Sequence, residues 1–199
     1  MERKWLVGIV AGVLALAAVL ALIGGGVVGR SIVPSPATTP QPAPPETVRF
    51  RDSLTDVAIA YPSTWVRRIS KDQAVRVLAS SSDDSAGLSV SVRKSGITEE
   101  VNLRNLAAVR PLTDDLLRGD DRITTKAEPV AVTVGGLVGY RYRYTYTTAD
   151  KTEGAHDHYF LFKKQRLVQI VLQAVPSTSL GTLQPTFDRI VGSFQIPRS

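Results

Sequence analysis

An uninterrupted apolar run near the start of the chain constrains its fold most strongly. Residues 5–28 read WLVGIVAGVLALAAVLALIGGGVV and contain no charged side chain. Because a helix rises about 1.5 Å per residue, this run would reach roughly 36 Å, enough to cross a hydrocarbon core about 30 Å thick. We therefore predict one transmembrane helix, with the lipid bilayer as the partner of residues 5–28.

The charges that flank this run predict its orientation. Arg3 and Lys4 precede the run together with the α-amino group, and only Arg30 follows it before the next segment. The positive-inside bias then places the N-terminus in the cytoplasm and the later residues outside. A cleaved secretory signal is the alternative, but it would need a shorter apolar region and a better cleavage site than residues 27–29 offer. We expect a single-pass signal anchor at residues 1–30, in the cell membrane.

A proline-rich stretch separates the anchor from the rest of the chain. The sequence PSPATTPQPAPPET at 34–47 has few large apolar side chains, so we expect an extended spacer and assign 31–47 as a linker. Residues 48–197 are enough for one extracytoplasmic domain with its own core. The chain contains no cysteine, which excludes lipoprotein processing, disulfides, thiol nucleophiles and cysteine zinc sites.

The hydrophobic pattern of the domain predicts an α+β fold. Apolar residues recur mostly with period two, and helical spacing interrupts this pattern at 100–118, where Pro111 marks a kink or break, and at 183–194. Strands joined by hairpins form antiparallel sheets, and helices with one apolar stripe cover them, so we predict an antiparallel sheet flanked by helices. The predicted strands are 48–51, 57–61, 74–80, 87–94, 130–134, 137–148, 156–163 and 167–175.

Four sequence segments, and the order in which they occur along the chain, resemble the PsbP and Mog1 type of domain. FRDSLTDVAIAYPSTW at 50–65 is similar to its opening, in which a strand ends in Tyr-Pro near a Trp. GLVGYRYRYTY at 136–146, HYFLFKKQRLVQIVLQA at 158–174 and FDRIVGSF at 187–194 are similar to the hairpin and closing helix of PsbP-like bacterial envelope domains. The resemblance implies a PsbP/Mog1-like sandwich and a mostly non-enzymatic accessory or binding module. Many bacterial relatives are lipoproteins, whereas this chain would use a helical anchor.

Two arginines are the candidate binding residues. Arg141 and Arg143 share one face of a predicted strand, and the opposite face carries a row of tyrosines at 140, 142, 144 and 146. We expect the tyrosines to lie in the core beneath a helix, although such a row could line a ligand groove. The arginines could bind an anionic partner together with Lys163, or they could form ion pairs with acidic residues on the neighbouring strand.

Metal binding and catalysis receive little support from the sequence. His156 and His158 would point to one face of a strand, as two metal ligands would, but no third ligand is evident. We expect both side chains to be partly exposed, with no metal and no cofactor. The chain has no G-x-S-x-G or S-x-x-K string. The chain has three pairs of adjacent aspartates, at Asp83-Asp84, Asp114-Asp115 and Asp120-Asp121. These pairs are typical of solvated turns and helix ends, so we predict no catalytic residue.

The charge distribution argues against nucleic acid as a partner. The formal net charge is +6, but basic and acidic residues are mixed along the chain and not gathered on one element. We predict a non-enzymatic binding or accessory module whose partner is a protein or an anionic component of the envelope. The alternatives are a sensor or structural subunit that pairs through its transmembrane helix with another membrane protein and, with less support, an envelope hydrolase.

Overall fold

The computed structural model describes residues 46–196 of the chain. The predicted anchor at 1–30 and nearly all of the predicted linker at 31–47 therefore lie outside the described residues. No helix between residues 46 and 196 combines the length and the apolar character that a membrane span requires.

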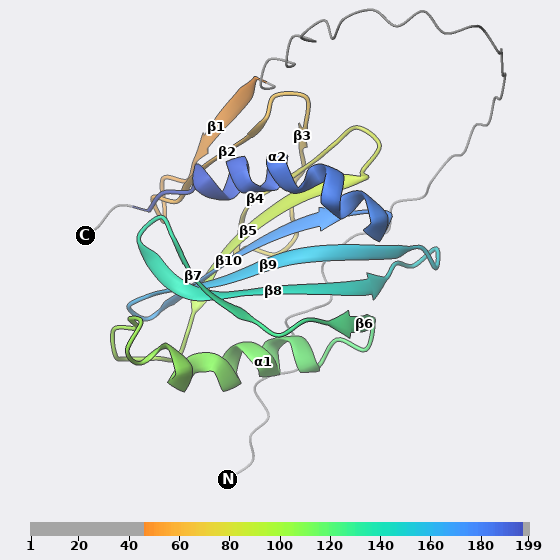
Figure 1. Cartoon of the computed structure of the whole chain (residues 1–199). Helices are drawn as coiled ribbons and strands as arrows, with labels where there is room; N and C mark the ends of the chain where they lie inside the picture. The colour runs from red at the N-terminus through yellow and green to blue at the C-terminus, as the bar shows by residue number, and fades with distance from the viewer. Residues whose placement is uncertain (1–45, 197–199) are drawn as a thin grey trace, which may run out of the picture.

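The described residues form two antiparallel sheets (Figure 1). The larger sheet has the strand order β3-β4-β5-β10-β9-β8-β6, and β7 pairs with β8 beside β6; the smaller sheet is the β1-β2 hairpin. The strands are β1 Thr47–Arg51, β2 Ala58–Pro62, β3 Val66–Arg67, β4 Val75–Ser80, β5 Ala86–Lys94, β6 Ile123–Lys126, β7 Val130–Val134, β8 Leu137–Thr147, β9 Glu153–Lys163 and β10 Arg166–Ala174.

Helices cover both faces of the larger sheet. α1 (Arg110–Arg118) follows a short 3-10 turn at Leu106–Val109, and α2 (Leu180–Gly192) follows another at Ser177–Ser179. The two helices lie on opposite sides of the sheet, and the β1-β2 hairpin lies near the end of α2 (Figure 1). This arrangement confirms the predicted α+β class, an antiparallel sheet flanked by helices.

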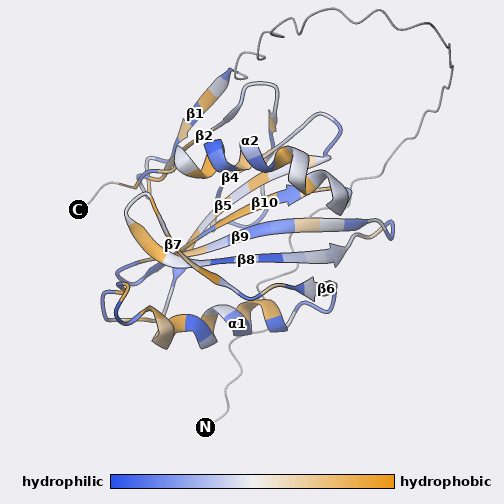
Figure 2. Cartoon of the chain, viewed as in Figure 1, coloured by the Kyte–Doolittle hydropathy of each residue, from blue (hydrophilic) through white to orange (hydrophobic). Residues whose placement is uncertain are grey.

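Each face of the sheet has its own apolar core. Under α2, Phe187 and Ile190 pack on alternate residues of β10, among them Ile170. Under α1, Leu117 packs with the tyrosines of β8 and with Phe160. Apolar and polar residues alternate along both helices in Figure 2, as expected for helices that bury one stripe.

The structure corrects three details of the predicted elements. The helix predicted at 100–118 is α-helical only from Arg110. Pro111 lies in the first turn of this helix, where its missing N–H costs nothing, so it marks the start of α1 and does not kink the helix. The short strands β3 and β6 were not predicted. β6 reads ITTK, and its pairing with β8 contains an irregularity, so the sequence shows no clean alternation there.

Candidate functional site

The two candidate arginines lie on the α2 side of β8, and both are half-buried. The register of β8 with β9 places Arg141 opposite Tyr159 and Arg143 opposite Asp157. The Tyr159 side chain, across the β8-β9 pair, carries a neutral hydroxyl. The pKa of this hydroxyl is raised above its ordinary value, mainly because it is buried. Arg141 therefore faces a neutral partner.

Arg143 forms a two-pronged ion pair with Asp157. Its Nε lies 2.9 Å from Asp157 Oδ1 and its Nη2 lies 2.8 Å from Asp157 Oδ2. The same Nη2 donates to Gln184 Oε1 of α2 at 2.5 Å. The Asp157 side chain has an exposed fraction of 0%, whereas that of Arg143 is 42% exposed. The hydrogen bond to Asp157 is the main reason that the pKa of Arg143 is raised above its ordinary value. Arg143 therefore supplies the counter-charge of a fully buried carboxylate.

The tyrosine row forms part of the core beneath α1, as predicted. All four side chains are buried, and Tyr142 has an exposed fraction of 0%. The Tyr142 hydroxyl lies 2.6 Å from Thr113 Oγ1 and donates to Asp114 Oδ1 at 3.0 Å, and both partners belong to α1. These bonds join the helix to the sheet, so the row supports the fold and does not line an open groove beneath α1.

The two histidines lie deeper than the sequence indicated. His156 is 8% exposed and His158 is 7% exposed, so the expectation of partly exposed side chains was wrong. Both rings lie on the face of β9 that packs against the tyrosines, where His158 stacks on Phe160 with ring centroids 4.0 Å apart. The sequence could not indicate this, because the depth of that face depends on the side chains of the neighbouring strands β8 and β10.

Three polar side chains lie within hydrogen-bonding distance of the ring nitrogens of the two histidines. The Tyr144 hydroxyl lies 3.0 Å from His156 Nδ1 and 3.1 Å from His158 Nδ1. On the other side of the rings, Gln173 Oε1 lies 3.3 Å from His156 Nε2, and Gln169 Oε1 lies 3.1 Å from His158 Nε2. Burial lowers the pKa of His156 to about 4 and that of His158 to about 3. Both imidazoles are therefore neutral at pH 7 and act as structural hydrogen-bonding groups.

The described residues show no cluster of three or more metal-ligating side chains. Asp114 and Asp120, from two of the three acidic pairs, are held by protein partners. Asp114 accepts from Tyr142, and Asp120 Oδ2 accepts from Arg122 Nη2 at 2.7 Å. The hydrogen bonds from Arg122 are the main reason that the pKa of Asp120 is lowered. The Asp114 carboxylate therefore links α1 to β8, and the Asp120 carboxylate stabilises the turn after α1.

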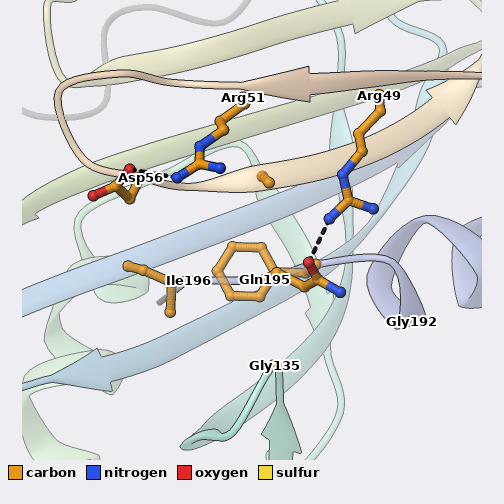
Figure 3. A pocket seen from close by; sticks show the side chains of 9 residues that line it. Arg49, Arg51, Asp56, Gly135, Gly192, Gln195 and Ile196 are labelled. Atoms are coloured by element: carbon orange, nitrogen blue, oxygen red, sulfur yellow. Dashed lines mark hydrogen bonds and ion pairs between the residues drawn. The ribbon is translucent and has the colours of Figure 1, made fainter. Parts of the chain in front are cut away.

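A surface cavity of about 480 Å³ lies where β1, the β7-β8 turn and the end of α2 meet (Figure 3). We call it the arginine hollow, because Arg49 and Arg51 of β1 both point toward it. Its residues are Arg49, Arg51, Asp56, Ala58, Gly135, Gly192, Phe194, Gln195 and Ile196. Phe194 and Ile196 are buried and supply an apolar floor beneath the two guanidinium groups.

Within residues 46–196, the arginines of the hollow pair with exposed polar groups. Arg49 donates to the side chain of Gln195, and Arg51 Nη2 lies 3.0 Å from Asp56 Oδ1. Exposed ion pairs contribute little free energy, about 0–1 kcal/mol, so another anion can replace Asp56 at small cost. The hollow can therefore present two guanidinium groups to a carboxylate or a phosphate.

Gly135 shapes one wall of the hollow. Its φ is +57°, and a Cβ atom at this position would lie 2.7 Å from the ring of Phe194. Only glycine adopts this conformation easily and permits this close approach. Arg49, Arg51 and Gly135 were not predicted as site residues, although residues 49–51 repeat the Arg-x-Arg spacing of residues 141–143.

Comparison with solved structures identifies the fold. A cyanobacterial PsbP (CyanoP) from Synechocystis sp. PCC 6803 is 18% identical, with a TM-score of 0.56, and the match covers 81% of this chain and 99% of that chain. LpqN of Mycobacterium tuberculosis, described as involved in cell envelope biogenesis, is 13% identical with a TM-score of 0.57, over 77% of this chain and 91% of that one. The Saccharomyces cerevisiae Ran-binding protein Mog1p is 8% identical with a TM-score of 0.49, over 77% and 96%.

The matches to the cyanobacterial PsbP and to LpqN confirm the predicted PsbP/Mog1-like fold. At these identities they establish the fold alone. No protein-family model matches the chain, and no curated protein matches its sequence.

Proposed function

We propose that the chain is a membrane-anchored, extracytoplasmic accessory module that binds a protein or an anionic component of the cell envelope without acting as an enzyme. The arginine hollow is the observation that carries this proposal. It is an open surface feature that combines two exposed guanidinium groups with an apolar floor. The likeness of the fold to LpqN, a protein involved in cell envelope biogenesis, agrees with such a role.

The chemistry of the hollow favours a carboxylate or a phosphate group attached to a larger molecule. Guanidinium groups bind such groups in a two-pronged geometry, and Arg49 and Arg51 point to the same side of β1 because one residue separates them. Phe194 and Ile196 are almost fully buried, so they close the base of the hollow, and the two guanidinium groups provide the contact with the partner. Because the arginines are exposed, the attraction should weaken as the salt concentration rises.

Loss of the two arginines should reduce partner capture. We expect the full chain carrying Arg49→Ala and Arg51→Ala to retain its fold but to lose most of the partner that chemical cross-linking and pull-down recover from membranes. The matched control is Arg104→Ala with Arg118→Ala, which removes the same charge from exposed positions outside the hollow. Equal losses in both variants would mean that net charge alone attracts the partner. Full capture by the Arg49/Arg51 variant would reject the hollow as the site.

Arg141 and Arg143 remain a second proposed contact for the same partner. Arg143 is engaged with Asp157, so a binding test should change Arg141 alone, which leaves that ion pair in place. If Arg141 contacts the partner, Arg141→Ala should lower capture and the salt dependence of capture together.

The proposed location rests on the apolar run at residues 5–28 and on the basic residues before it. Protease added to intact spheroplasts should digest the domain and leave a short membrane-embedded fragment, because only the N-terminal residues would be inside. The control is a protease-sensitive cytoplasmic marker protein, which should stay undigested as long as the membrane is intact. A domain that is protected like the marker, or that is released without protease, would rule out this topology.

A further inference from the structure

β7 forms an open edge of the larger sheet. Within residues 46–196, β7 pairs with β8 and with no other strand. β6 pairs with β8 farther along the same edge, and Pro129 lies between the two short strands. An edge strand has backbone N–H and C=O groups that can pair with another chain.

The register of the β7-β8 hairpin identifies the groups that point outward. Gly135 and Gly136 form a two-residue turn with positive φ at both positions, so Val134 and Leu137 flank it as a hydrogen-bonded pair. Hydrogen-bonded pairs alternate along an antiparallel ladder. Ala131 and Thr133 therefore direct their N–H and C=O groups away from β8, and both residues are exposed.

The sequence of β7 lacks the features that usually protect a sheet edge. It reads VAVTV, with no charged residue, no proline and no bulge in its pairing with β8. By contrast, β6 contains Lys126 and an irregular register, and β3 at the opposite edge has only two residues. Charged side chains, bulges and very short strands are the devices by which proteins keep edges unpaired.

We propose that β7 pairs with β7 of a second copy of this chain, antiparallel and about a twofold axis at Val132. In this register Ala131 of each copy lies opposite Thr133 of the other. Both residues direct their backbone groups outward, so the two pairs form four hydrogen bonds. Val132 then faces Val132 of the second copy in the central pair that is not hydrogen-bonded. No charged residue of the strand meets a like charge, because the strand contains none.

The surroundings of β7 fit this occupant. The same register places Val130 of one copy opposite Val134 of the other, beside a cavity of about 360 Å³ between β7 and α2. Thr133 and Val134 of β7 line this cavity together with Val191 of α2. Val130 is 50% exposed in the single chain, so pairing would remove apolar surface from water on both copies.

The register ends at residues that cannot extend it. Pro129 precedes β7 and has no N–H to donate, and Gly135 turns the chain back at the other end. The twofold operation places these two residues opposite each other. The pairing is therefore limited to the five residues of β7, and the register about Val132 is the one that uses all five.

Cysteine substitution tests this register directly, because the chain has no cysteine of its own. Val132→Cys in the purified full chain should give a disulfide-linked dimer under mild oxidation, since facing Cβ atoms in such a pair are about 4.5–5.5 Å apart. Thr133→Cys should form the dimer at least about tenfold more slowly, because the two Thr133 positions are diagonal neighbours too far apart for a disulfide. Val66→Cys, at the exposed edge strand β3, is the control for random collision.

A proline at the outward-pointing position distinguishes edge pairing from other kinds of association. Thr133→Pro removes an N–H that β8 does not use, so the single chain should still fold, and thermal unfolding will verify this. Added to Val132→Cys, this change should reduce the dimer to the level of Val66→Cys. The proposal is overturned if Val132→Cys oxidises no faster than Val66→Cys, which is also the result expected if another polypeptide pairs with β7. It is likewise overturned if Thr133→Cys oxidises as fast as Val132→Cys.

Discussion

Replacing Arg143 with alanine should destabilise the domain by about 3–5 kcal/mol, because it leaves a buried carboxylate without its counter-ion. Asp157 is fully buried, and both of its carboxylate oxygens accept hydrogen bonds from Arg143. After the substitution, only the longer bond from Gln184 Nε2, at 3.4 Å, would remain among its side-chain partners in the described residues. Water that enters beside the half-exposed Arg143 position would favour the lower end of this range. Denaturant unfolding at pH 7 measures the loss.

The chain offers a matched control two residues earlier on the same strand. Arg141 lies on the same face of β8, but the residue opposite it is the neutral Tyr159. We expect Arg141→Ala to cost no more than about 1.5 kcal/mol, the usual contribution of one hydrogen bond. Similar losses for the two variants would show that the buried charge of Asp157 is not the cause.

Removing both charges provides the second control. Arg143→Met combined with Asp157→Leu should recover most of the stability that Arg143→Ala loses, since apolar residues of similar volume can replace a buried ion pair without large cost. If the double variant is as unstable as the single one, the pair stabilises the fold by packing and not by neutralisation.

The architecture of the domain could be predicted because the pattern of side chains reports which faces are covered. The alternation of tyrosine and arginine in β8 predicted one buried face and one polar face, and both lie as expected. The apolar stripe that includes Phe187 likewise predicted a closing helix that packs on the sheet. Local patterns of this kind depend on neighbours a few residues apart, so they can be read from one sequence.

The features that depend on strand pairing could not be predicted. The partner of Arg143 is determined by the register of β8 with β9, and the depth of His156 depends on the neighbouring strands β8 and β10. The arginine hollow combines β1 with Gly135 and the residues after α2, which are far apart in the sequence. No pattern within β1 alone indicates that its arginines would face the end of a helix.

Acidification should unfold the domain well above the pH at which its carboxylates titrate. His156 and His158 have pKa values of about 4 and about 3 in the folded state, mainly because burial disfavours the charged imidazole. In the unfolded chain both should titrate near 6.5. Above pH 6.5 neither state binds these protons, so the histidines do not affect stability there. Below pH 6.5 only the unfolded state binds them, so stability falls as the pH falls.

The expected loss is large because two histidines act together. Each pH unit below 6.5 costs up to about 1.4 kcal/mol for each histidine, so about 5 kcal/mol is lost by pH 4.5. The other ionisable groups near these rings are Asp120, Arg122, Tyr144 and Tyr146. The pKa of Asp120 is lowered from 3.8, and that of Tyr146 is raised to about 12, so neither titrates between pH 7 and pH 4.5.

A variant without histidines isolates this effect, because the chain contains only these two. His156→Gln with His158→Gln removes both rings, and it should start from a lower stability at pH 7 because the stacking on Phe160 and the bonds to Tyr144 are lost. The free energy of unfolding of this variant should then change little between pH 7 and pH 4.5, whereas that of the parent should fall steeply. Each single variant should retain about half of the slope, since the two protons are bound separately in the unfolded chain. An unchanged slope in the double variant would mean that other groups cause the acid unfolding, and that the two imidazoles can accept protons within the folded domain.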